Sequence, residues 1–318
     1  MFKKIAFFVG SGISYCSKAP SVEQLTKEIL ESAWFLHTDE CFYPAPEKIA
    51  PNDELMQQAH EDALEIQKFI RLVYEHISNH IANKECRLPN YEDIYGCLSQ
   101  IFQDETLGIV NPLIVSDMDA LKDKSLDLWM PIKLRRGDTR FASLARQAAD
   151  LIECAICCLL GNKKPKGLDL FIKTKGIVDE MDVFTLNHDT LIEQQFEDAA
   201  IPYTDGFGIE DRDVRWFDSK CFSSVRSQDP SAVRLFKLHG SINWLRSSEN
   251  KYAKALKIPY DLLKDARGKK IDFVGNERNV LTGTITKGQY YGHDPFIELF
   301  SQFHCRLKEH NVIIFRAL

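Results

Sequence analysis

The chain has 318 residues, enough for one large domain or two ordinary ones. Apolar residues make up 44% of it and charged residues 27%, as in a globular protein that folds around an apolar core. The formal net charge of −6 gives no general attraction to nucleic acid, and no segment reaches the roughly 18 uninterrupted apolar residues of a membrane span. We therefore expect no membrane association and no direct nucleic-acid binding.

The cysteines and the first residues favour a reducing compartment. Nine cysteines are scattered along the chain, an odd number that argues against a disulfide framework. Lys3 and Lys4 precede an apolar run of only five residues that ends in glycine, which is not the layout of a secretion signal. We expect a cytoplasmic protein with reduced thiols.

The first predicted element is a buried strand, from Ile5 to Val9, followed directly by Gly10-Ser11-Gly12. An unbroken apolar run is typical of a parallel strand covered on both faces. Glycines after such a strand let the backbone approach a ligand, and free N–H groups at a helix start favour a phosphate. A Gly-x-Gly pattern alone is equally consistent with a tight strand-to-helix turn that binds nothing.

The middle of the chain is predicted to be helical. Ser21 is a helix N-cap with Gln24 placed for a capping box, and that helix extends to about Trp34. A proline-containing loop covers residues 42–51, and apolar residues at steps of three and four then predict a helix from about residue 53 to 82. Further helices are predicted from residue 90 to 102 and from 140 to 160, whereas residues 107–137 have no clear pattern.

The second half alternates between strands and helices. Strands are predicted at residues 182–186, 233–238, 280–285 and 312–315, with helices at 167–175, 191–196 and 295–307. This alternation predicts an α/β fold with a Rossmann-like parallel sheet, formed by residues 1–35 and 167–318. Residues 36–166 form a large helical insertion in this prediction.

Polar groups follow three of the predicted strands. They are Gly10-Ser11-Gly12, Asn187-His188-Asp189 and His239-Gly240. Ligands of parallel sheets bind beyond the carboxyl ends of the strands. If the three strands are neighbours, these groups converge on one site.

The three motifs together resemble those of sirtuins. The run from Gly10 to Ser14 is similar to the sirtuin Gly-Ala-Gly-Ile-Ser, and the run from Thr185 to Asp189 is similar to Thr-Gln-Asn-x-Asp. His239-Gly240 resembles the catalytic His-Gly. Order and approximate spacing agree best with the SIR2-like domains of bacterial antiviral defence systems. The resemblance implies a sirtuin-like fold and NAD+ as substrate.

The resemblance also implies roles for individual residues. His239 is expected to be the general base, and Asn187 to bind the ribose next to nicotinamide and to place the attacking water. His188 and Asp189 are expected to contact the carboxamide. The other implied NAD+-binding residues lie at two further strand ends: Gly10, Ser11, Gly12 and Ser14 for the pyrophosphate, and Gly283 and Thr284 near the adenosine half.

Three departures from the sirtuin pattern bear on the activity. Only one Cys-x-x-Cys pair occurs, Cys154 and Cys157 in an apolar helix, so no four-ligand zinc site is expected within the chain. No Asp-Phe-Arg run follows the glycine turn. Both departures favour simple NAD+ hydrolysis over acyl-lysine chemistry. The family's loop after the last strand is not found after Phe315, so we expect adenosine binding to be weaker or to be completed by another subunit or partner.

The leading hypothesis is an NAD+ hydrolase that yields nicotinamide and ADP-ribose and serves as the effector of an antiphage, abortive-infection system. The resemblance implies that it is held inactive until triggered, by homo-oligomerisation or by a co-encoded partner such as an ATPase or a nucleotide-processing protein. The alternative is a catalytically weak NAD+ or ADP-ribose sensor or scaffold. A zinc-free protein deacylase or ADP-ribosyltransferase ranks last.

Overall fold

The computed structural model describes residues 4–37, 40–42, 54–85, 87–107, 115–125, 139–161, 163–208, 214–229, 232–247, 255–259, 276–280 and 294–316. Within these ranges no helix is both long enough and apolar enough to span a bilayer. The chain forms two compact units, one of Met1–Ala19, Leu160–Leu281 and Gly288–Leu318, the other of Pro20–Leu159 and Thr282–Lys287. The domain boundaries expected from the sequence, at 35/36 and 166/167, stay a prediction.

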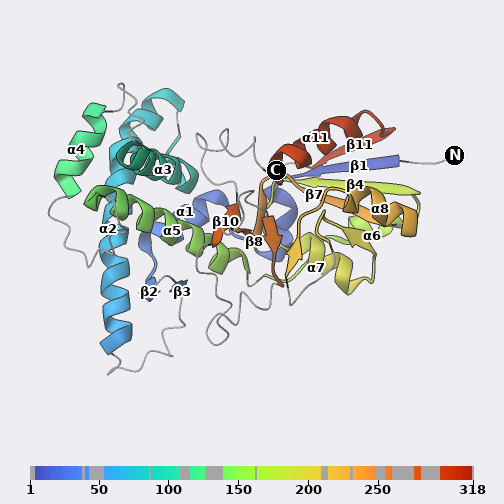
Figure 1. The fold of residues 1–318 in the computed structure, drawn as a ribbon, viewed down its shortest axis with the longest axis horizontal. Coiled ribbons are helices and arrows are strands. Elements are labelled where there is room, and N and C mark those ends of the chain that lie inside the picture. Colours follow the sequence, from blue (N-terminus) through green and yellow to red (C-terminus); the bar gives the residue numbers. More distant parts are fainter. Residues whose placement is uncertain are drawn as a thin grey trace. The chain divides into compact units, whose positions relative to one another are not determined.

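The first unit is built on a five-stranded sheet in the order β11-β1-β4-β7-β5. Its strands are β1 (Lys4–Val9), β4 (Glu180–Thr185), β5 (Tyr203–Thr204), β7 (Val233–Lys237) and β11 (Val312–Arg316). Every neighbouring pair is parallel. The predicted Rossmann-like α/β fold is therefore confirmed, and β1, β4 and β7 are adjacent, so their carboxyl ends lie at one edge of the sheet (Figure 1).

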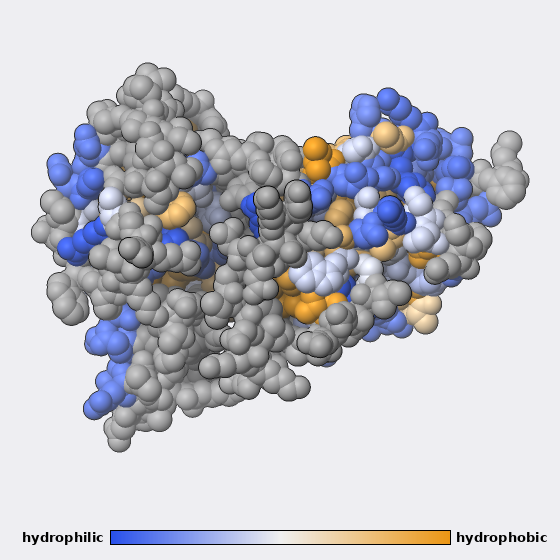
Figure 2. All heavy atoms as spheres, viewed as in Figure 1, coloured by the Kyte–Doolittle hydropathy of each residue, from blue (hydrophilic) through white to orange (hydrophobic). Residues whose placement is uncertain are grey.

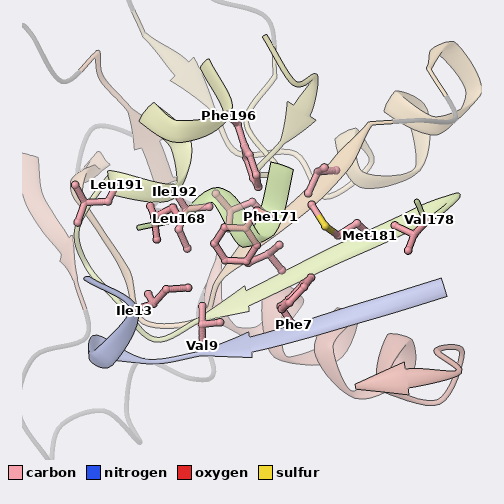
Figure 3. Close-up of a cluster of buried hydrophobic side chains, with 13 residues drawn as sticks. Phe7, Val9, Ile13, Leu168, Phe171, Val178, Met181, Leu191, Ile192 and Phe196 are labelled. Atoms are coloured by element: carbon pink, nitrogen blue, oxygen red, sulfur yellow. The ribbon is translucent and has the colours of Figure 1, made fainter. Parts of the chain in front are cut away.

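Helices cover both faces of this sheet, and the period of two along each strand explains why. On one face, Phe7, Val183 and Leu235 pack against α6 (Asp169–Lys175) and α7 (Leu191–Asp198), as Figure 3 shows for part of this cluster. On the other face, Phe184 and Phe236 pack against α8 (Cys221–Gln228) and α11 (Phe296–Leu307). Adjacent residues of one strand thus face opposite layers, which explains why apolar residues occur at successive positions of these strands.

A buried ion pair lies toward the amino ends of the strands, away from the motif residues. Arg234 donates two hydrogen bonds to the Asp182 carboxylate, at 2.5 and 2.8 Å. The Nε2 atom of His310 is 3.3 Å from the same carboxylate. Burial alone would raise the pKa of Asp182, but the hydrogen bond from His310 and the charge of Arg234 outweigh it and lower that pKa.

A second sheet, which is antiparallel, was not predicted from the sequence. Its order is β10-β8-β9-β6, with β6 (Arg215–Trp216), β8 (Gly240–Ser247), β9 (Ala255–Lys257) and β10 (Asn276–Val280). Of the strand predicted at residues 280–285, only Val280 is described, as the last residue of β10; residues 281–285 lie outside the described part.

Gly206 lies before this second sheet in a conformation that only glycine adopts easily, with φ of +88°. A Cβ atom there would lie 2.6 Å from the Phe217 ring and 2.8 Å from the Phe222 ring. We predict that Gly206→Ala lowers the free energy of unfolding by about 2–4 kcal/mol, because strain and overpacking add. Urea unfolding measures this, with Gly176→Ala as control: its Cβ would make only ordinary contacts, the nearest at 3.6 Å. Equal stability of the two variants would contradict the prediction.

The second unit is mainly helical. It contains α1 (Val22–Glu31), a hairpin of β2 (Phe35–His37) and β3 (Glu40–Phe42), α2 (Glu54–Glu85), α3 (Tyr91–Leu107), α4 (Val115–Ser125) and most of α5 (Arg140–Gly161). The predicted capping box of Ser21 and Gln24 is confirmed. The hairpin and α4 were not predicted, and residues 43–51 of the predicted loop lie outside the described part.

Buried polar contacts hold the helices of this unit together. The Gln67 side chain on α2 donates hydrogen bonds to the carbonyl groups of Ile29 and Ser32, both at 2.8 Å. The N–H of Tyr91, at the start of α3, donates to the Thr26 hydroxyl on α1 at 3.0 Å.

In the view of Figure 2, hydrophilic residues dominate the coloured surface around α11 of the first unit.

Candidate active site

The end of β1 is an open backbone turn. Gly10 donates a hydrogen bond to the Arg316 carbonyl at 3.2 Å, and the chain then enters a 3-10 helix, η1 (Ser11–Ser17). A helix start leaves the first N–H groups, here those of Ser11 and Gly12, without intrahelical acceptors. A Cβ atom on Gly10 would meet no heavy atom within 4 Å. The turn therefore offers backbone donors and room for a ligand beside them.

The end of β4 is tied to η1 by a buried hydrogen-bonded chain. Ser14 Oγ donates to Asp189 Oδ2 at 2.7 Å, and Asn187 Nδ2 donates to Ser14 Oγ at 3.0 Å. The other Asp189 oxygen accepts the N–H of Leu191, the first residue of α7, at 3.1 Å. Residues 175 positions apart in sequence are thereby fixed against each other at the carboxyl edge of the sheet.

This chain also determines the orientation of the Asn187 amide. Ser14 gives its only hydroxyl proton to the carboxylate, so its oxygen can only accept from Asn187, and the amide must present its NH₂ group there. Asn187 Oδ1 accepts no hydrogen bond from any residue in the described part of the chain. Its carbonyl oxygen is thus available to a hydroxyl group or a water molecule.

The end of β7 brings His239 to the same place. Leu238 donates its N–H to the Thr185 carbonyl at 2.9 Å, so the tips of β4 and β7 run side by side. The His239 ring lies 6.2 Å, centroid to centroid, from the His188 ring. Gly240, with φ of +79°, turns the chain at once into β8. His239 is partly exposed while His188 is buried, so a ligand at this edge has access to His239.

Charged residues behind these tips were missed by the sequence analysis. Lys237 on β7 contacts the carbonyl oxygen of Asp189 and lies 2.9 Å from Glu193 Oε1 on α7. Lys257 on β9 forms a second buried pair with Asp205. Burial alone would lower the pKa of Lys257, but the carboxylates of Asp205 and Glu193 outweigh it and raise that pKa. For Lys237, the available signal was a lysine inside the predicted buried strand 233–238.

The structure brings most of the motif residues to one edge of the sheet. These residues are Gly10, Ser11, Gly12 and Ser14 after β1, Asn187, His188 and Asp189 after β4, and His239 after β7. Gly283 and Thr284 lie outside the described residues. In the ranges that are described, no group of three or more His, Cys, Asp or Glu side chains is arranged to hold a metal ion.

Ser14 connects two of the three motifs, which makes it a sensitive position. We predict that Ser14→Ala lowers the free energy of unfolding by about 1–3 kcal/mol, because the buried Asp189 carboxylate loses a hydrogen-bond donor. Chemical denaturation followed by tryptophan fluorescence measures this. Ser11→Ala is the matched control: Ser11 is exposed, so a change within about 0.5 kcal/mol is expected. A Ser14 variant as stable as this control would contradict the prediction.

Comparison with known families agrees with these motifs. Residues 182–281 match the family model of the SIR2-like domain. This segment includes the Asn187 and His239 motifs, β7 and β8, whereas the glycine turn lies outside it. The resemblance to SIR2-like domains is therefore confirmed for this part of the chain, and it relates the site to NAD+. No curated protein is significantly similar to the chain in sequence.

Proposed function

We propose that this protein is an NAD+ hydrolase that converts NAD+ and water to nicotinamide, ADP-ribose and a proton. One observation supports the proposal most: the hydrogen-bonded chain of Asn187, Ser14 and Asp189 lies at the same sheet edge as His239, within a fold whose residues 182–281 are SIR2-like. Sheet edges of this kind are where dinucleotides bind in doubly wound folds.

The site has the groups that this reaction needs. The bond between the ribose C1′ atom and the nicotinamide nitrogen breaks, and its electron pair leaves with nicotinamide. Water then attacks C1′, and its proton passes to His239. Histidine is the only type of residue whose side chain has an unperturbed pKa between 5 and 8. The Asn187 carbonyl oxygen accepts a hydrogen bond from the ribose or from that water, and the amide is already held in the required orientation.

The glycine turn is the proposed pyrophosphate site. Backbone N–H groups of Ser11 and Gly12 donate to phosphate oxygens, and the open space over Gly10 admits them. Ser14 is 2% exposed and its hydroxyl is engaged by Asp189 and Asn187, so its role in this proposal is to position Asn187. Both carboxylate oxygens of Asp189 already accept hydrogen bonds, from Ser14 and from the Leu191 N–H. In the proposed contact, the carboxamide NH₂ group therefore donates a further hydrogen bond to this carboxylate.

The biological role that we propose rests on the resemblance. Unrestrained NAD+ hydrolysis kills a growing cell, so such an enzyme has to be inactive until infection. We propose an effector of antiphage abortive infection, controlled by homo-oligomerisation or by a co-encoded ATPase or nucleotide-processing partner. The sensor or scaffold alternative predicts binding without turnover.

The test is to incubate the purified protein with NAD+, alone and with the products of its neighbouring genes, and to quantify nicotinamide and ADP-ribose. Equal amounts of both products, without any acceptor, are expected. Product formation that requires an acceptor peptide would instead indicate a deacylase or transferase. Calorimetric binding of NAD+ that leaves it intact under every condition would indicate a sensor.

A further inference from the structure

The loop between β4 and α7 is held from one side by the segment that carries His239. The His188 carbonyl oxygen accepts hydrogen bonds from the Ser241 hydroxyl at 3.2 Å and from the Ile242 N–H at 3.0 Å. The next carbonyl in the chain, that of Asp189, is contacted by the Lys237 ammonium group. The backbone on both sides of the Asp189 N–H is thus fixed by residues 237–242.

Lys237 is unusual because it is almost completely buried in a strand that is otherwise apolar on this side. It is 1% exposed, and its partner Glu193, on the first turn of α7, is 3% exposed. Removing two charges from water is expensive, and well-packed apolar residues are often at least as stabilising as a buried ion pair. Stability alone therefore does not explain this pair, and its contact with the loop is the feature to explain.

We propose that Lys237 is a positioning residue for the reaction at this site, an inference that rests on the proposed NAD+ hydrolase function. Glu193 holds the Lys237 ammonium group in place, and that group holds the Asp189 carbonyl. The loop then keeps Asn187 and His188 in register with His239, which lies two residues after Lys237 on the same chain segment. Small displacements of reacting groups cost large factors in rate, so such a constraint affects turnover.

A double variant separates positioning from folding. Lys237→Met with Glu193→Leu removes the contact to Asp189 and leaves no buried charge unpaired. The matched control is Lys257→Met with Asp205→Leu, which removes the neighbouring buried pair. Within the described part of the chain, this pair makes no hydrogen bond to the loop 187–190. We expect the Lys237 double variant to melt within a few degrees of wild type and to lose at least about tenfold in kcat for nicotinamide release, with KM for NAD+ changed less than about threefold. The control should keep its kcat.

Amide hydrogen exchange gives a readout that does not need turnover. In the Lys237 double variant the amides of residues 188–193 should exchange faster than in wild type, while those of β1 and β11 keep their protection. Wild-type kcat together with unchanged exchange in this loop would overturn the proposal. If wild-type protein releases no nicotinamide, either alone or with the products of its neighbouring genes, the hydrolase function fails. Unchanged loop exchange would still overturn the positioning role, and faster exchange would support it.

Discussion

Replacing His239 by alanine is expected to slow nicotinamide release from NAD+ by about a hundredfold or more, the usual loss when a general base is removed. The imidazole is partly exposed at the end of β7, so the variant creates no large internal cavity and the fold should be kept. Steady-state release of nicotinamide, measured with saturating NAD+, tests this.

His304→Ala is the matched control for this prediction. His304 is an exposed histidine on α11, a helix that covers the face of the sheet rather than its carboxyl edge. Its loss should leave the rate of nicotinamide release unchanged. A His239 variant as active as this control would show that the proton is accepted by another group, and the base assigned here would be wrong.

The largest effect on stability is expected at the buried pair of Asp182 and Arg234. Asp182→Asn should lower the free energy of unfolding by about 3–5 kcal/mol, because the Arg234 charge stays buried without its bidentate partner. Denaturant unfolding measures this. Glu31→Gln is the control: its ion pair with Lys27 is more than half exposed on both sides, so a change of at most about 1 kcal/mol is expected.

The same pair predicts how stability depends on pH. The pKa of Asp182 is lower in the folded protein than in the unfolded chain, where it is about 3.9. The stabilisation from this group is therefore complete above the unfolded pKa and is lost as the pH falls through the folded one. Wild-type stability should fall more steeply below pH 4 than that of Asp182→Asn, in unfolding curves measured at each pH. Parallel curves for the two proteins would contradict this assignment.

The sequence predicted the parallel sheet and the convergence of its tips for identifiable reasons. β1, β4 and β7 each carry apolar residues on both faces, so apolar residues stand at successive positions, as in Phe7-Phe8, Val183-Phe184 and Leu235-Phe236, and are easy to recognise. The groups at their ends follow directly in sequence, and parallel neighbours place such groups together. The adjacency of the three strands was an assumption, and the observed strand order confirms it.

The second sheet could not be predicted in the same way. β6 has two residues and β9 has three, too few to show any period, and they pair with β8 across distant positions. The buried polar contacts were also hidden. Asp182 and Arg234 meet through strand register, and Lys237 meets Asp189 across two strand ends 48 residues apart in sequence. Such pairings depend on the packed fold, so sequence periodicity does not reveal them.

The most direct test of the proposed activity is nicotinamide release from NAD+ by wild-type protein and by Asn187→Ala, measured side by side with NAD+ binding. Asn187 follows β4, and its amide group is oriented by the hydrogen bond that it donates to Ser14. In the variant, Ser14 still has Asp189 as the acceptor of its own hydrogen bond. We predict turnover in wild type and a loss of about a hundredfold or more in the variant, with NAD+ still bound. Equal rates in both proteins, or tight binding without turnover in wild type under every condition, would contradict the assignment of this site as an NAD+ hydrolase.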